Sequence, residues 1–205
     1  AWENTPKVPH EKKTILVAPS WQKDNIMDSC IDQLIEQFLR PGVRLIIRPH
    51  PQYVRLYGEK IEGLQSRYKD KLGEDFILQT DFSSTDTVYS ADLLVTDWSN
   101  VGFEFALSTL KPVLYINTPM KIMNPEYDKI DVVPFDIRIR GQLGGELELR
   151  ELDRAGDVAQ DLLSRPEEFR ETIQAVKEKE IYNLGHGAEA AGRYIVKRLG
   201  SRKTQ

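Results

Sequence analysis

The chain has 205 residues, of which 40% are hydrophobic and 29% are charged, and its formal net charge is −4 at pH 7. This composition is that of an ordinary globular domain with enough residues to bury a substantial core. The acidic balance argues against a general nucleic-acid-binding protein, and no apolar run approaches the roughly 18 residues of a membrane span.

The first segment, residues 1–13, is polar and proline-bearing, which predicts a linker. It opens AWENTPKVPH without an initiator Met, so we expect a fragment of a longer protein. The single cysteine, Cys30, excludes an internal disulfide and a cysteine-based zinc site. A chain with one cysteine fits a reducing, cytoplasmic compartment.

Strand-like and helix-like segments alternate from residue 14 onward. The predicted strands are 14–18, 43–47, 75–79, 92–96 and 112–116. The predicted helices between them are 27–40, a polar stretch ending near residue 72, 84–91 and 100–108. Short apolar strands separated by helices are typical of a parallel sheet covered on both faces. We therefore expect an α/β fold over residues 14–205, a Rossmann-like doubly wound parallel sheet.

The last third of the chain is organised differently. Residues 117–145 are rich in prolines and glycines, which predicts a long irregular connection. Helices are expected at 151–163, 166–181 and 187–199, and the second begins with a proline in its first turn.

Several common nucleotide and hydrolase motifs are missing from the sequence. No GxGxxG follows the first strand, and neither GxxxxGK[ST] nor GxSxG occurs. Three histidines and one cysteine leave little for a metal site, so we expect none. A nucleotide site in this chain has to be built in another way.

Three loops follow predicted strands and carry polar residues. They read APSWQKDN at 18–25, RPHP at 48–51 and TDWSN at 96–100. In a doubly wound sheet such loops lie on the same carboxyl edge, near the reversal of strand order, where ligands bind. The candidate binding residues on this edge are Ser20, Arg48, His50, Asp97, Ser99 and Asn100.

Each of these loops also has a purely structural interpretation. Pro49 and Pro51 stop the strand and fix His50 in a stiff turn, which is either a site or a surface turn. Ser99 and Asn100 precede an apolar helix, so they either cap that helix or leave its N–H groups free for an anion. The presence of both features on one edge favours a site.

A fourth candidate precedes the last predicted helix. Gly185 and Gly187 flank His186 in NLGHGAEAAG, and glycines allow close approach of the backbone to an anion. A glycine-rich entry to a terminal helix is the equally open alternative.

These stretches together resemble a known family. ILVAPSW (15–21), RPHP (48–51), DLLVTDWSNVGFEFAL (92–107), PVLYI (112–116) and NLGHGAEAAGRYI (183–195) are similar to the CDP-glycerol glycerophosphotransferase family of teichoic acid polymerases. They match its C-terminal nucleotide-binding domain, one half of a GT-B architecture. The His-Pro and Ser-Ser pairing also recurs in bacterial sialyltransferases and Kdo transferases.

The resemblance implies roles for individual residues. His50 matches the histidine expected to contact the donor phosphate or assist the leaving group, and is the expected catalytic residue. Ser99 matches the first serine of the family's serine pair, which holds phosphate oxygens. Trp98, Asn100 and Glu104 replace the family's tyrosine, second serine and aspartate, so the donor stays open. Arg48 either contacts the donor or pairs with a surface carboxylate.

The implied function is binding of CDP-glycerol, or another cytidine-activated donor, and transfer of its group to a cell-envelope polymer or lipid-linked acceptor. An N-terminal acceptor domain of the same protein would be missing, so this chain alone is expected to be inactive. No strong candidate for the base exists within 14–205, and His10 in the linker stays open as one. The resemblance also implies a cytoplasmic location, which could include the inner face of the cell membrane.

Three other functions remain open. The nearest is a glycosyltransferase donor domain that uses a CMP-sugar or UDP-sugar. The others are a non-catalytic nucleotide-sugar-binding module and a sugar-nucleotide 2-epimerase. The epimerase is disfavoured because few acidic and histidine residues follow the predicted strands.

Overall fold

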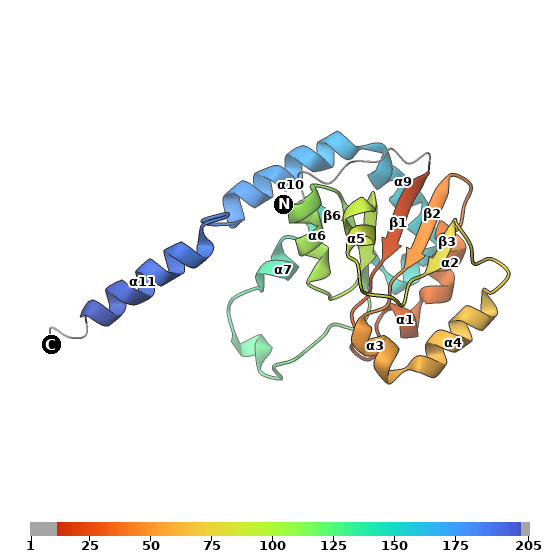
Figure 1. The fold of residues 1–205 in the computed structure, drawn as a ribbon, viewed down its shortest axis with the longest axis horizontal. Coiled ribbons are helices and arrows are strands. Elements are labelled where there is room, and N and C mark those ends of the chain that lie inside the picture. The colour runs from red at the N-terminus through yellow and green to blue at the C-terminus, as the bar shows by residue number, and fades with distance from the viewer. Residues whose placement is uncertain (1–11, 202–205) are drawn as a thin grey trace.

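The computed structural model describes residues 12–201. Its centre is a six-stranded sheet of order β3-β2-β1-β4-β5-β6, in which every neighbouring pair is parallel (Figure 1). The strands are β1 (Lys13–Val17), β2 (Val43–Ile47), β3 (Phe76–Leu78), β4 (Leu93–Thr96), β5 (Val113–Asn117) and β6 (Gly144–Glu148). The predicted Rossmann-like doubly wound sheet is confirmed, and its strand order reverses between β1 and β4.

Helices cover both faces of the sheet. One face packs against α1 (Ile26–Ser29), α2 (Ile31–Phe38), α4 (Gly58–Arg67) and α9 (Ala155–Ser164). The other packs against α5 (Asp86–Ser90), α6 (Val101–Thr109), α8 (Arg140–Leu143) and α10 (Pro166–Glu180). The remaining elements are α3 (Pro51–Leu56), α7 (Phe135–Arg138), α11 (Gly187–Ser201) and the 3-10 turns η2 (Tyr127–Lys129) and η3 (Leu149–Arg154).

The pattern of strand residues explains the two-sided core. Ile15 and Val17 of β1 belong to one apolar cluster, and Leu16 between them belongs to the other. Successive side chains of a strand point to opposite faces, so a strand buried on both faces must be apolar at every position. The central strands are the most completely buried part of the chain for this reason.

The sixth strand was not predicted. The expected irregular connection from 117 to 145 ends in β6, which pairs with β5 so that Gly144 lies opposite Val113. Two glycines and two glutamates in GGELE resemble a loop, and only Leu147 is buried. The strand forms because β5 offers a free edge for backbone pairing, which a local pattern does not reveal.

Two predicted helices are each divided in the structure. The helix expected at 27–40 is interrupted at Cys30, whose φ of −156° is not helical. The polar stretch after β2 forms α3 and α4, separated at Tyr57. The sequence predicted a stiff turn at Pro51. In the structure Pro51 occupies the first position of α3, where its missing N–H leaves no hydrogen bond unmade.

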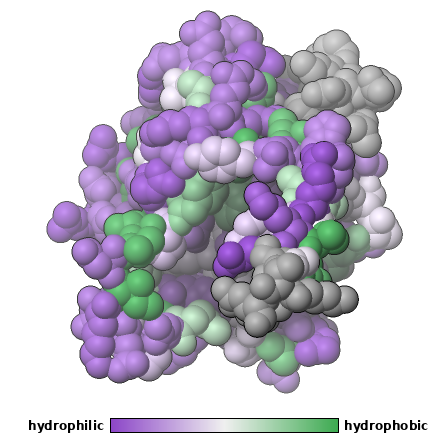
Figure 2. Space-filling model, turned by 90° about the vertical axis from the view of Figure 1, so that its left-hand side faces the viewer, coloured by the Kyte–Doolittle hydropathy of each residue, from purple (hydrophilic) through white to green (hydrophobic). Residues whose placement is uncertain are grey.

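Two segments leave apolar side chains exposed. In the connection after β5, the side chains of Ile122, Met123, Ile130, Val132 and Val133 are each more than half exposed. Helix α11 projects away from the sheet and exposes Tyr194, Ile195, Val196 and Leu199 (Figure 1). Seen from the side to which α11 projects, the surface is mainly hydrophilic with separate hydrophobic patches (Figure 2).

The start of β6 provides a test of the sheet. A Cβ added at Gly144 would lie 1.9 Å from the carbonyl oxygen of Val113, whereas one at Gly145 would meet only side-chain atoms at 3.4 Å or more. We expect Gly144→Ala to lower the free energy of unfolding by about 1–3 kcal/mol, the usual cost of overpacking. Thermal unfolding should show a near-native melting temperature for Gly145→Ala; equal melting temperatures for the two variants would contradict the β5–β6 register.

Candidate functional site

The loops after β1 and β4 are joined by one buried carboxylate. Asp97 is 1% exposed, and its Oδ1 accepts the backbone N–H of Ser20 at 2.8 Å while its Oδ2 accepts that of Ile26 at 3.1 Å. The hydroxyl of Thr96 donates to the carbonyl of Ala18 at 2.7 Å. These bonds fix the point where the strand order reverses, which is the usual ligand site of an open α/β sheet.

His50 lies at the end of β2, on the same edge. Its Nδ1 accepts the backbone N–H of Gln52 at 3.0 Å, so the imidazole itself is the N-cap of α3. In the neutral ring the proton then resides on Nε2, which is left as a hydrogen-bond donor. Burial first, and then the charge of Lys121, lower the pKa of His50, which favours this neutral form. The ring of Trp21 lies 6.2 Å away, centroid to centroid.

Ser99 and Asn100 begin α6 on the other side of the reversal point. Asn100 occupies the N-cap position, but its side chain makes no capping hydrogen bond. The hydroxyl of Ser99 accepts the N–H of Val101 at a long 3.4 Å. The first turn of α6 is therefore weakly capped, and a weakly capped helix N-terminus favours an anion.

The structure brings these two groups to one edge but not into contact. β1 lies between β2 and β4, so the strand ends that carry His50 and Ser99 are separated by two strand spacings, about 10 Å. A ligand that uses both groups has to span the end of β1, across Ser20 and Asp97.

Ser20 and Arg48 lie on the same edge in different settings. The Ser20 hydroxyl is buried without a hydrogen-bond partner among the described residues. The Arg48 guanidinium turns toward the connection after β3, where it donates to Thr87 at 3.3 Å and lies 5.2 Å from the ring centroid of Phe82. Burial lowers the pKa of Arg48, and the charge of Asp81 opposes that shift. A direct role for Arg48 in donor binding stays a prediction.

The glycine-flanked histidine is not brought to this edge. Gly185 and His186 lie between α10 and α11, and Gly187 begins α11, far from the ends of β1 and β2 where α1 and α3 begin (Figure 1). His186 is largely exposed, and its imidazole lies 3.7 Å from the carboxylate of Glu189. Their role in donor binding stays a prediction that this arrangement does not support.

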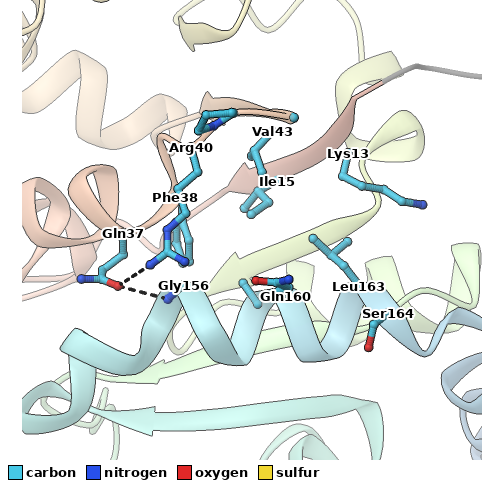
Figure 3. Close-up of a pocket in the computed structure, with 13 residues that line it drawn as sticks. Lys13, Ile15, Gln37, Phe38, Arg40, Val43, Gly156, Gln160, Leu163 and Ser164 are labelled. Carbon is cyan, nitrogen blue, oxygen red and sulfur yellow. Dashed lines mark hydrogen bonds between the residues drawn. The ribbon is translucent and has the colours of Figure 1, made fainter.

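A cavity of about 330 Å³ opens at the opposite, amino edge of the sheet (Figure 3). Ile15, Val43 and Leu163 give it an apolar wall, between β1, β2 and α9. The guanidinium of Arg40 donates to Gln37 at 3.2 Å and lies 3.6 Å from Asp157, so that cation is already partnered. The carboxyl edge, by contrast, gathers the polar groups that a nucleotide requires.

Sequence reasoning missed the buried arginine beneath the loop after β4. Arg140 is 3% exposed and lies beside Trp98 at the start of α8. It falls in the proline- and glycine-rich connection, where nothing in the sequence distinguishes it from other surface arginines.

Residues 12–201 contain neither a metal-binding cluster nor a membrane-spanning helix. No group of three or more His, Cys, Asp or Glu side chains in this range is arranged to hold a metal ion. None of its helices combines the length and the apolar character needed to cross a membrane. His10, an open candidate for the base, and most of the expected linker at 1–13 lie outside the described residues.

The family model of CDP-Glycerol:Poly(glycerophosphate) glycerophosphotransferase matches residues 2–123. The chain belongs to this family. The match covers both loops of the reversal point and His50, and it ends before Arg140 and His186.

One known teichoic acid enzyme is similar to part of this chain. The chain is 28% identical over 125 residues to the teichoic acid glycerol-phosphate primase of Bacillus subtilis (strain 168), which is 58% of this chain and 29% of that protein. It therefore spans less than a third of that relative's length.

Solved structures share the fold at low sequence identity. The glycotransferase of kitacinnamycin superposes with a TM-score of 0.61 at 15% identity, over 96% of this chain and 46% of that one. TarM gives a TM-score of 0.54 at 16% identity, over 95% and 36% of the two chains. At such identities the likeness shows the fold alone.

Asp97 provides a test of the site's architecture. An asparagine at position 97 has one acceptor oxygen for two backbone N–H groups, so Asp97→Asn should cost about 2–3 kcal/mol of unfolding free energy. Asp92→Asn is the matched control, because Asp92 accepts only the N–H of Thr14, which an asparagine oxygen can also accept. Chemical denaturation that gave both variants the same stability would contradict this account of Asp97.

Proposed function

We propose that this chain binds a cytidine-activated donor, CDP-glycerol or a related compound, at the carboxyl edge of its sheet. Within a longer protein the donor's glycerophosphate or related group is transferred to a cell-envelope polymer or a lipid-linked acceptor. The observation that carries the proposal is that His50 and the weakly capped start of α6 flank the reversal point inside the family-matched region. The donor lies across Ser20 and the end of β1, a span of about 10 Å.

The chemistry follows from these groups. An acceptor hydroxyl forms a bond to the phosphorus that carries the glycerol, and the bond from that phosphorus to the cytidine phosphate oxygen breaks. The electron pair leaves with CMP, so negative charge grows on the leaving phosphate. The Nε2–H of His50 donates a hydrogen bond to that phosphate, and the first turn of α6 with Ser99 holds phosphate oxygens.

The acceptor and the base belong to another part of the protein in this proposal. The exposed apolar side chains of the connection after β5 and of α11 support a contact with another domain, since exposed apolar patches mark interaction sites. The relative from Bacillus subtilis is more than three times as long as the matched segment. The 205-residue chain is then the donor-binding half, inactive in isolation and located in the cytoplasm or at the inner face of the membrane.

Nucleotide binding tests the proposal directly. Calorimetry with CDP-glycerol, CDP, CMP and UDP should show a preference for cytidine nucleotides. His50→Asn keeps a capping oxygen at the start of α3 but removes the imidazole, so its melting temperature should stay near that of the parent. Its affinity for CDP-glycerol should fall about tenfold or more, the equivalent of one charge-assisted hydrogen bond. Ser99→Ala should show a smaller loss.

His186→Gln is the control, because His186 belongs to the junction of α10 and α11, away from the carboxyl edge (Figure 1). Tighter binding of UDP than of CDP would favour a glycosyltransferase or an epimerase that uses UDP-sugars. Unchanged affinity in both His50→Asn and Ser99→Ala would mean that the site is elsewhere. No nucleotide binding by the parent would favour an interaction module.

A further inference from the structure

The strongest unexplained feature near the site is the buried guanidinium of Arg140. Its Cζ lies 4.2 Å from the ring centroid of Trp98 and 4.4 Å from that of Tyr115. One nitrogen, Nη2, donates to Asn117 at 2.8 Å, at the end of β5. A planar cation between two aromatic rings is a geometry that arginine adopts and lysine does not.

The ring that Arg140 contacts belongs to the turn that carries the proposed phosphate site. Trp98 lies between Asp97 and Ser99, and its indole N–H donates to the carbonyl of Thr118 at 2.8 Å. Arg140 and Trp98 both line a recess of about 10 Å³ that also includes Ser99. Movement of the Trp98 ring would therefore move the Ser99 turn.

Arg140 also interacts with several carboxylates of this region. Glu146 lies 3.5 Å from its Nε, which is buried and makes no hydrogen bond. Burial lowers the pKa of Arg140, and the charges of Glu146, Asp97 and Asp136 oppose that shift. Arginine stays protonated under these conditions. Without this cation, Asp97 and Asp136, which line the same recess as Ser99, would lose a compensating positive charge beside the proposed phosphate site.

Stability alone is a poor reason for this arrangement. Replacing buried charges by apolar groups of similar size is often neutral or stabilising, because desolvation of the ions is costly. Trp98 and Tyr115 would pack against a methionine at position 140 without that cost. The buried charge is better explained by an effect on an anionic ligand.

We propose that Arg140 is a positioning residue for the donor phosphate. Its guanidinium holds the Trp98 ring and with it the Ser99 turn, and its charge offsets the carboxylates that would repel a phosphate. The inference rests on the proposed function, since it concerns the same site. Arg140 lies under the turn and does not touch the donor.

The test compares a ligand that carries phosphates with one that does not. CDP and cytidine are titrated by NMR into the 205-residue chain and into its Arg140→Gln, Arg140→Lys and Trp98→Phe variants. Arg140→Gln should weaken CDP about tenfold, roughly the effect of one charged hydrogen bond, and change cytidine affinity less than about twofold. Arg140→Lys keeps the charge without the stacked plane, so its CDP affinity should lie between those of Gln and the parent.

A double-mutant cycle tests whether Arg140 acts through Trp98. The Trp98→Phe/Arg140→Gln double variant should lose less CDP affinity than the product of the single losses, since the two groups are in contact. Equal weakening of CDP and cytidine, or a lower melting temperature with unchanged CDP affinity, would overturn the inference and leave the proposed function standing. If Arg140→Gln does not fold, the affinities of Arg140→Lys for CDP and cytidine are compared in the same way. Failure of the parent to bind CDP would remove the proposed function and this inference with it.

Discussion

The candidate site depends on the carboxylate of Asp97. β1 and β4 are neighbours, but the chain leaves them in loops that have no regular pairing of their own. Asp97 supplies that pairing by accepting two backbone N–H groups of the loop after β1. Hydrogen bonds from backbone N–H groups to a carboxylate are short and strong, so the two bonds hold the loop firmly. The turn proposed to bind phosphate follows directly after Asp97 in the chain. Its geometry therefore depends on the two hydrogen bonds that Asp97 accepts.

His50, like Asp97, makes a hydrogen bond that fixes the local backbone next to the proposed site. Its Nδ1 caps α3, and Pro51 occupies the first helical position, so the ring is fixed by the start of the helix that follows it. A histidine that uses one nitrogen in a structural bond has its tautomer determined by that bond. The turn that caps α3 therefore also holds the imidazole proposed to bind the donor, and leaves its Nε2 as a hydrogen-bond donor. In our proposal Arg140 extends this principle to a residue far along the chain, because it contacts the ring of Trp98 next to Ser99.

The sequence was sufficient for most of the fold, and the location of the site stays a prediction. Apolar runs such as 43–47 and 92–96 are buried on both faces, so local composition alone predicts them as strands of a parallel sheet. The carboxyl-edge rule then brings the regions of Ser20, His50 and Ser99 together without knowledge of contacts. It could not predict β6, which depends on pairing with β5, nor the burial of Arg140, which depends on its contacts with Trp98 and Tyr115. The place of the group around His186 could not be predicted either, because a glycine-flanked histidine before a helix looks the same in sequence wherever the helix lies.

The central claim is that the donor lies across the carboxyl edge at the reversal of strand order. A crystal structure of the 205-residue chain grown with CDP tests it most directly. We predict that the phosphates lie within hydrogen-bonding distance of the Nε2 of His50 or of Ser99 and the first turn of α6, with the nucleotide crossing the end of β1. Density for CDP in the cavity beside Arg40 at the amino edge, or at the junction of α10 and α11 near His186, would contradict the claim.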